Sequence, residues 1–127
     1  MSLLVDDSSR HDIKWTTPIS KLIRNDFVLE DEYATNHLTI EDALSHRSSM
    51  PGHDLSYEST HFDRKATVKD NVQSMRFLPL TAEPLTKFQY CNLMCMAASH
   101  VIETLTGEWL GDVIARLIWK PLGMTAT

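Results

Sequence analysis

Apolar residues in the last third of the chain recur with the period of a helix, and this spacing constrains the fold more than any other feature. Residues 93, 97, 101 and 105 form one apolar row with 94, 98 and 102 beside it, and Gly107 follows where helices favour a glycine. Three apolar pairs, four residues apart, continue to Ile118, and Pro121 and Gly123 end the run. We predict two consecutive helices, find no stretch with the alternation of a strand, and expect a mainly α chain.

Two capping patterns mark the starts of further helices. The segment 39–42, Thr-Ile-Glu-Asp, has the form of a capping box with Asp in place of Glu or Gln, and predicts a helix to about His46. Thr67 precedes apolar residues at helical spacing, which predicts a helix that it caps and that stops near Leu78.

Weaker signals lie towards the N-terminus. Thr17 is predicted to be the N-cap of a short helix that begins at Pro18, and residues 1–5 are interpreted as the last turns of a helix. The stretch between residues 23 and 39 is polar, and residues 53–66 have little periodicity. No element is predicted in either stretch.

The charge balance excludes several classes of partner. Twelve Lys and Arg residues against seventeen Asp and Glu leave a formal net charge of -5, without a basic run. Nucleic acid and membranes are therefore not expected partners. The longest apolar run, residues 93–98, is far shorter than the roughly 20 residues of a spanning helix, and the first residues lack the features of a signal peptide. The sequence predicts no particular localisation.

Cys91 and Cys95 lie four residues apart on the predicted helix. They are too few and too local for a secreted disulfide framework, and the histidines lack the spacing that would complete a zinc site. We predict two buried thiols, no metal site and no cofactor.

The segment that most suggests chemistry is Tyr90-Cys91-Asn92. An irregular segment, 80–88, leads to Tyr90, which is predicted to face outward just before the helix. Alone, the triplet is more simply interpreted as a partly buried tyrosine with a bonded hydroxyl. His46 is interpreted as a structural histidine bonded to backbone near its turn, and Trp109 and Trp119 are interpreted as core or interface anchors.

Four landmarks place this triplet in context. They are Leu44–Pro51, Phe88–Asn92, Glu103–Gly107 and Pro121–Met124 with Thr127. In order and spacing they resemble the β-lactamase-related serine hydrolases, which include class C β-lactamases, DD-peptidases and related esterases, over nearly the whole chain. The resemblance departs at Ser48-Ser49, where the family commonly has Ser-Gly. Glycine reaches a positive φ without strain, and Gly52 is a candidate for shifting the turn.

The resemblance implies a fold class and a domain. Residues 1–127 would be one partial domain, the helical middle of an α/β fold whose central sheet is missing. The family's Ser-x-x-Lys would lie shortly upstream of Met1, and its Lys or His-x-Gly strand motif well downstream of Thr127. None of the six lysines has a serine three residues before it, so the nucleophile is absent. We expect a fragment of a serine hydrolase that is inactive alone.

The resemblance also assigns roles to the triplet. Tyr90 matches the general base that takes the proton of the serine, and Asn92 matches the residue that positions the family's lysine and the substrate carbonyl. A phenol, with an ordinary pKa of about 10, is a poor base at neutral pH without nearby ammonium groups. The substrate of the intact protein would be a small-molecule or peptide ester, amide or β-lactam, which the fold does not name.

Two other functions stay open. A non-catalytic helical module derived from the family would act in binding or as a scaffold, and would fold as a stable monomer. A fragment would instead expose the apolar face of residues 93–118 and self-associate. An acyl-transfer enzyme with Cys91 as its nucleophile would need a histidine partner, but Cys91 is interpreted as a packing residue.

Overall fold

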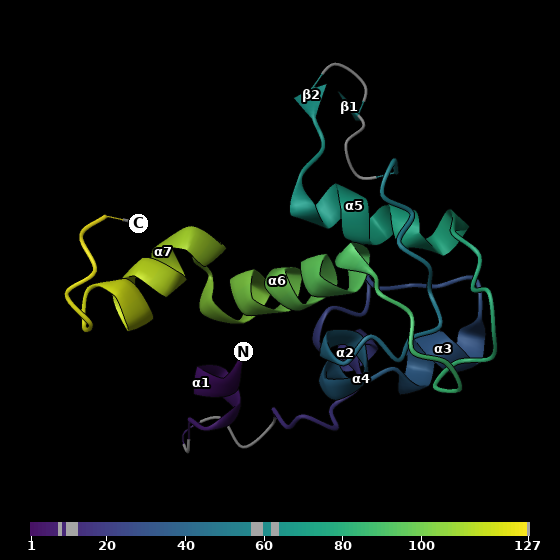
Figure 1. Ribbon diagram of the computed structural model, residues 1–127, viewed down its shortest axis with the longest axis horizontal. Helices are drawn as coiled ribbons and strands as arrows, with labels where there is room; N and C mark the ends of the chain where they lie inside the picture. Colours follow the sequence, from purple (N-terminus) through teal and green to yellow (C-terminus); the bar gives the residue numbers. More distant parts are fainter. Residues whose placement is uncertain (8, 10–12, 57–59, 62–63, 127) are drawn as a thin grey trace.

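The computed structural model describes residues 1–7, 9, 13–56, 60–61 and 64–126, and most of its elements are helices (Figure 1). In chain order the elements are α1 (Ser2–Val5), α2 (Ile19–Leu22), α3 (Glu32–His37), α4 (Ile40–Leu44), β1 (Thr60–His61), β2 (Arg64–Lys65), α5 (Val68–Ser74), the 3-10 turn η1 (Met75–Phe77), α6 (Asn92–Thr106), α7 (Leu110–Ile114) and η2, a wide helical turn (Ala115–Trp119).

Helix α6 forms the centre of the fold. It packs against α5 on one side and against α2 and α4 on another, as Figure 1 shows. The predicted apolar row accounts for this position, because Leu93, Met94, Ala97 and Val101 are fully buried. Gly107 ends the helix with a φ of 70°, a left-handed conformation that glycine adopts without steric cost. The prediction for this helix is confirmed.

Both predicted capping patterns are present. The Thr39 hydroxyl accepts from the Asp42 backbone N–H at 3.2 Å, and the Asp42 carboxylate accepts from the Thr39 N–H at 3.1 Å. Thr67 and Asp70 make the same reciprocal pair at 3.2 and 2.8 Å. Each box satisfies N–H groups that a helix leaves without a partner at its start.

Thr17 is not the cap of α2, which corrects the prediction. The N-cap is Pro18, without a side-chain cap, and the Thr17 hydroxyl accepts from the Lys14 N–H at 2.9 Å. The backbone at Thr17 instead closes a turn, in which its N–H donates to the Lys14 carbonyl at 2.9 Å, and pairs with a distant segment: the Thr17 carbonyl accepts from the Ile40 N–H at 3.2 Å. Pro18 and Thr39 form an isolated antiparallel bridge beside this bond.

Three elements, one helix and two strands, lie where none was predicted. Helix α3 is six residues long, with the Asp31 carboxylate accepting from the Ala34 N–H at 2.6 Å at its start. Strands β1 and β2 form an antiparallel hairpin in which Thr60 pairs with Lys65 and His61 with Arg64. They are the strands that the described residues form.

The C-terminal segment forms the predicted second helix but is much less buried. Its first part is α7, and η2 completes it. Val113 is its buried residue, whereas Trp109 is 68% exposed and Ile118 is 39% exposed. Of the two interpretations of Trp109, core or interface anchor, the first is therefore wrong and the second stays a prediction: its ring lies over Gly111, where any Cβ would collide with it. Trp119 is partly buried.

Candidate active site

Tyr90, Cys91 and Asn92 occupy the junction between the irregular segment and the start of α6. Tyr90 lies outside any helix or strand and is 57% exposed, as predicted. Cys91 is extended, with φ -149° and ψ 112°, and its side chain is fully buried. Because side chains alternate along an extended backbone, the burial of Cys91 leaves its two neighbours on the outer side.

The two predicted site residues are in direct contact. The Tyr90 hydroxyl donates to the Asn92 amide oxygen at 2.8 Å. The Asn92 amide nitrogen in turn donates to the Asp54 carboxylate at 3.5 Å, a long hydrogen bond. A phenol, an amide and a carboxylate are therefore linked on one exposed surface, and the first two are groups that can move a proton or hold a carbonyl.

His46 lies against this pair. Its carbonyl accepts from the Gln89 N–H at 2.8 Å, and its Nδ1 accepts from the Cys91 N–H at 3.4 Å. The imidazole centroid lies 4.7 Å from that of the Tyr90 ring and 5.9 Å from that of the Phe88 ring. These contacts fit the interpretation of His46 as a histidine bonded to backbone. Its contact with the tyrosine ring was not predicted, because nothing local in the sequence links the two.

The turn after His46 has a left-handed backbone at the position where the resemblance led us to expect a glycine. Ser49 has a φ of 60°, in the left-handed region, and Gly52 is not among the residues with positive φ, so the turn is not shifted to it. Ser49 is fully buried, and its hydroxyl donates to the Glu83 carbonyl at 2.7 Å while its carbonyl accepts from the Thr81 N–H at 3.1 Å. These bonds offset the strain of a serine at this position.

The two thiols differ. Burial raises the pKa of the Cys91 thiol, which keeps it protonated and a poor nucleophile. This supports packing over catalysis. Cys95 is only partly buried, so the prediction of two buried thiols holds for one of them. Among the residues that the structure describes, no group of three or more His, Cys, Asp or Glu side chains is placed to hold a metal ion.

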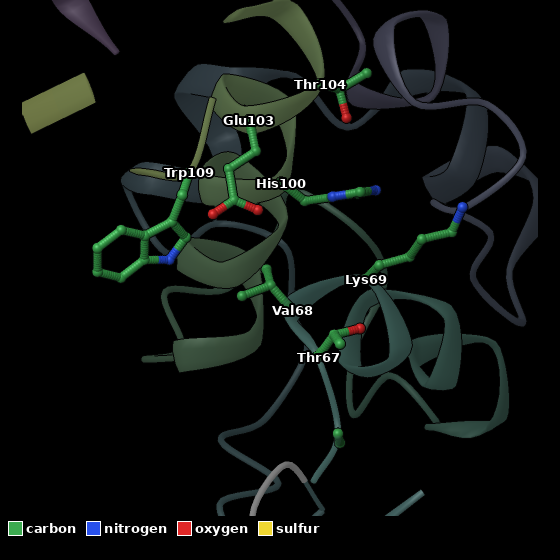
Figure 2. A pocket seen from close by; sticks show the side chains of 8 residues that line it. Thr67, Val68, Lys69, His100, Glu103, Thr104 and Trp109 are labelled. Carbon is green, nitrogen blue, oxygen red and sulfur yellow. The ribbon is translucent and has the colours of Figure 1, made fainter. Parts of the chain in front are cut away.

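A hollow of about 580 Å³ lies elsewhere, between α5 and the end of α6 (Figure 2). Its lining residues are Ala66, Thr67, Val68, Lys69, His100, Glu103, Thr104 and Trp109. The polar ends of Lys69 and His100 are engaged by the Asp26 carboxylate, at 3.4 and 2.8 Å. The Glu103 carboxylate accepts from the Leu110 N–H at 3.1 Å. These groups hold helices together, so the hollow is not the candidate active site.

None of the described helices has the length and apolar character needed to span a bilayer. This agrees with the short apolar runs in the sequence.

Two known fungal proteins are similar to this chain over its whole length. The chain is 52% identical to the unguisins hydrolase ungD of Aspergillus violaceofuscus over 128 residues, covering 100% of this chain and 23% of that protein. It is 48% identical to the unguisins hydrolase ungD' of Aspergillus campestris, covering 24% of that protein. It therefore spans about a quarter of the length of these relatives.

A solved structure gives the same fold. The D-stereospecific amidohydrolase from Streptomyces superposes with a TM-score of 0.72 at 19% identity, over 96% of this chain and 38% of that one. The family described as Beta-lactamase matches residues 3–127. With the landmarks and the Tyr90–Asn92 contact, this match shows that the chain belongs to the beta-lactamase family of hydrolases.

Proposed function

We propose that Tyr90 and Asn92 form one wall of an acyl-transfer site that cleaves an ester, amide or β-lactam bond through an acyl-serine intermediate. The observation that carries the proposal is the 2.8 Å hydrogen bond from the Tyr90 hydroxyl to the Asn92 amide, on an exposed surface. The phenol is thereby held with its oxygen beside an amide that can bind both a donor and an acceptor.

The two residues have different roles in this reaction. Tyr90 takes the proton of the attacking serine and later returns a proton to the leaving group. Asn92 holds the lysine of the Ser-x-x-Lys motif and the substrate carbonyl. The chain contains no Ser-x-x-Lys, so in the whole protein the nucleophile and the ammonium groups that stabilise a phenolate come from outside residues 1–127.

The proposal also gives a role to α7 and η2. In the whole protein, the weakly buried face of α7 and η2 packs against the central sheet of the α/β fold. When the chain is alone, the same face supports self-association, because an uncovered apolar surface favours contact with another copy. The exposure of the Trp109 and Ile118 side chains, 68% and 39%, supports this proposal.

The names of the relatives narrow the range of substrates to test. Unguisins hydrolases share 48% and 52% identity with the full length of this chain, although the chain spans about a quarter of each. Unguisins are therefore the first substrates to test for the whole protein.

The decisive experiment replaces the matching segment of ungD from Aspergillus violaceofuscus with residues 3–127 and measures hydrolysis of unguisins. We expect the hybrid to be active and Tyr90→Phe to lower its kcat/KM by about 10²- to 10⁴-fold, the usual contribution of general acid–base catalysis. Asn92→Ala should lower it too. Tyr33→Phe is the matched control, since Tyr33 is 56% exposed and Tyr90 57%. An active hybrid that tolerates Tyr90→Phe would rule out the base role.

A second experiment tests the chain alone. Incubation of the purified chain with a fluorescent penicillin or an activated ester should leave it without stoichiometric covalent label. Labelling would mean that a nucleophile lies within residues 1–127, and Cys91→Ala would then identify or exclude the thiol.

A non-catalytic helical module is the second candidate, and the core favours it. Seventeen buried residues form one apolar cluster within this chain. A module of this kind unfolds sharply as a soluble monomer, whereas the fragment associates through its uncovered face. Thermal unfolding combined with sedimentation distinguishes the two.

A further inference from the structure

We infer that His46 is the positioning residue for the Tyr90 phenol. It holds the backbone on both sides of Tyr90 and packs its own ring against the tyrosine ring. The inference rests on the proposed function, because positioning matters for catalysis only if Tyr90 is the base. The contacts themselves can be tested without any catalysis.

The backbone contacts come first. The Gln89 and Cys91 N–H groups flank Tyr90 along the chain, and both donate to His46, the first to its carbonyl at 2.8 Å and the second to its Nδ1 at 3.4 Å. The second bond is long and therefore weaker. Tyr90 lies outside the helices and strands, so no regular ladder of hydrogen bonds fixes its backbone. One residue provides both acceptors instead.

The ring contact comes second. The imidazole and phenol rings have centroids 4.7 Å apart and planes tilted by 50°. The Phe88 ring meets the same imidazole edge-on, with centroids 5.9 Å apart and planes at 90°. Both separations lie in the range in which aromatic pairs attract one another. A tyrosine that is 57% exposed would otherwise exchange between rotamers, so the imidazole holds its hydroxyl near the Asn92 amide.

The backbone of His46 makes this arrangement possible. Its φ is 58°, and the left-handed region is accessible to glycine and, among other residues, mainly to Asn, Asp and His. The left-handed turn allows the carbonyl and the side chain of His46 to contact the same segment. Since the Cys91 N–H is a donor, Nδ1 must be the acceptor nitrogen, which assigns the ring proton to Nε2.

Two substitutions separate the backbone contact from the ring contact. His46→Gly keeps the left-handed backbone and removes both the Nδ1 acceptor and the ring. His46→Asn keeps that backbone and supplies an amide oxygen in the place of Nδ1, but has no ring. His53→Asn is the matched control. His53 also has a positive φ, 47°, but its Nε2 lies 3.3 Å from the Pro79 carbonyl, and its side chain is not among the described contacts of Tyr90 and Cys91.

Nuclear magnetic resonance of the chain then measures two quantities. Amide exchange at Cys91 reports the backbone contact, and three-bond couplings to the Tyr90 Cγ report how many χ1 rotamers are populated. In His46→Gly we expect Cys91 to exchange at least about tenfold faster and Tyr90 to average over rotamers. In His46→Asn, Cys91 keeps its protection while Tyr90 still averages. His53→Asn changes neither quantity.

Exchange at Ala97, fully buried in α6, shows whether a variant has lost its global fold. If His46→Gly fails to fold, His46→Asn alone decides the question. A single Tyr90 rotamer in the asparagine variant, as in the wild-type chain, would overturn the positioning role. So would unchanged Cys91 exchange in a folded glycine variant.

The hybrid hydrolase distinguishes this inference from the proposed function. If His46 acts through Tyr90, His46→Gly lowers kcat more than it changes KM and causes no further loss when added to Tyr90→Phe. A further loss in the double variant would overturn the inference. If Tyr90→Phe itself leaves the hybrid fully active, the proposed function fails, and the resonance data still decide whether His46 positions the phenol.

Discussion

The core layer, α2 to α6, and the C-terminal layer, made of α1, α7, η2 and the residues to Met124, have similar apolar patterns but very different burial. The main apolar cluster has seventeen residues, all between Ile13 and Val101. In the described part of the C-terminal layer the buried apolar residues are Leu4, 7% exposed, and Val113, 4% exposed. Figure 1 shows the cause: α7 extends beyond the end of α6, away from the helices that cover the rest of α6.

The difference teaches what helical periodicity can predict. An apolar row identifies the face of a helix that avoids water, but the partner that covers this face has to come from elsewhere in the protein. For α6 the partners are α2, α4 and α5. The apolar residues of η2 are covered less completely, since Ile118 is 39% exposed. Comparing equivalent changes in the two layers measures how far their contributions to stability differ.

The largest difference is expected for leucine truncation. Leu93→Ala removes a fully buried side chain, and the lost contacts and the cavity should lower the free energy of unfolding by about 2–5 kcal/mol. Leu122→Ala, at a side chain that is 70% exposed in the C-terminal layer, should change it by less than about 0.5 kcal/mol. Urea unfolding followed by circular dichroism measures both. Equal losses would mean that the C-terminal layer is as tightly packed as the core.

Ion pairs should show the same contrast on a smaller scale. The Asp26 carboxylate accepts from His100 at 2.8 Å and from Gln73 at 2.7 Å, with 14% of its side chain exposed. Asp26→Asn should cost about 1–3 kcal/mol in the free energy of unfolding, because it turns one of the two acceptor oxygens into a donor, so that one of the partnering donors loses its acceptor. Glu108→Gln is the control, since the Glu108–Arg116 pair is 40% and 50% exposed and such pairs contribute about 0–1 kcal/mol. A larger effect at Glu108 than at Asp26 would contradict this ranking.

Acid should lower the free energy of unfolding of the core layer by protonating the Asp26 carboxylate. Burial opposes ionisation of Asp26, but the hydrogen bonds from His100 and Gln73 and the charge of Lys69 together hold its pKa below the usual 3.8. A depressed folded-state pKa stabilises the fold above pH 3.8, and this contribution is lost as the pH falls through the folded-state value. Between pH 6 and pH 2, urea unfolding should therefore show a steeper loss of stability in the wild-type chain than in Asp26→Asn. Parallel pH profiles would exclude Asp26 as the cause.

Much of the core layer was predictable because its signals are local. The capping boxes at Thr39 and Thr67 and the apolar row of α6 each lie within one or two helical turns. Helix α3 was missed because its six residues bury only Ala34, which leaves no period to detect. Thr17 was assigned wrongly because its backbone pairs with Ile40, a contact that no local pattern contains.

The same limit applies to the candidate site. Tyr90 and Asn92 lie two residues apart at the start of a helix, so the contact between them follows from short-range geometry. The imidazole that touches Tyr90 comes from 45 residues before Cys91 in the sequence. Only the folded chain brings these segments together, through the left-handed backbone at His46 and the burial of Cys91.

The smallest effect on stability is expected for a substitution at Ile118. This variant is informative because a second measurement, of self-association, can be made on it. Ile118 lines an apolar groove with Leu3, Ile114 and Leu117. Ile118→Lys should change the free energy of unfolding by less than about 0.5 kcal/mol, because the side chain is 39% exposed. If the groove drives self-association, the variant should stay monomeric in sedimentation velocity at concentrations where the wild-type chain associates.

Leu55→Lys is the control: it places the same charge at an apolar residue that is 91% exposed and outside the groove, and association should persist. Association that survives Ile118→Lys would mean that another surface joins the copies, and a wild-type chain that is already monomeric would favour the helical module.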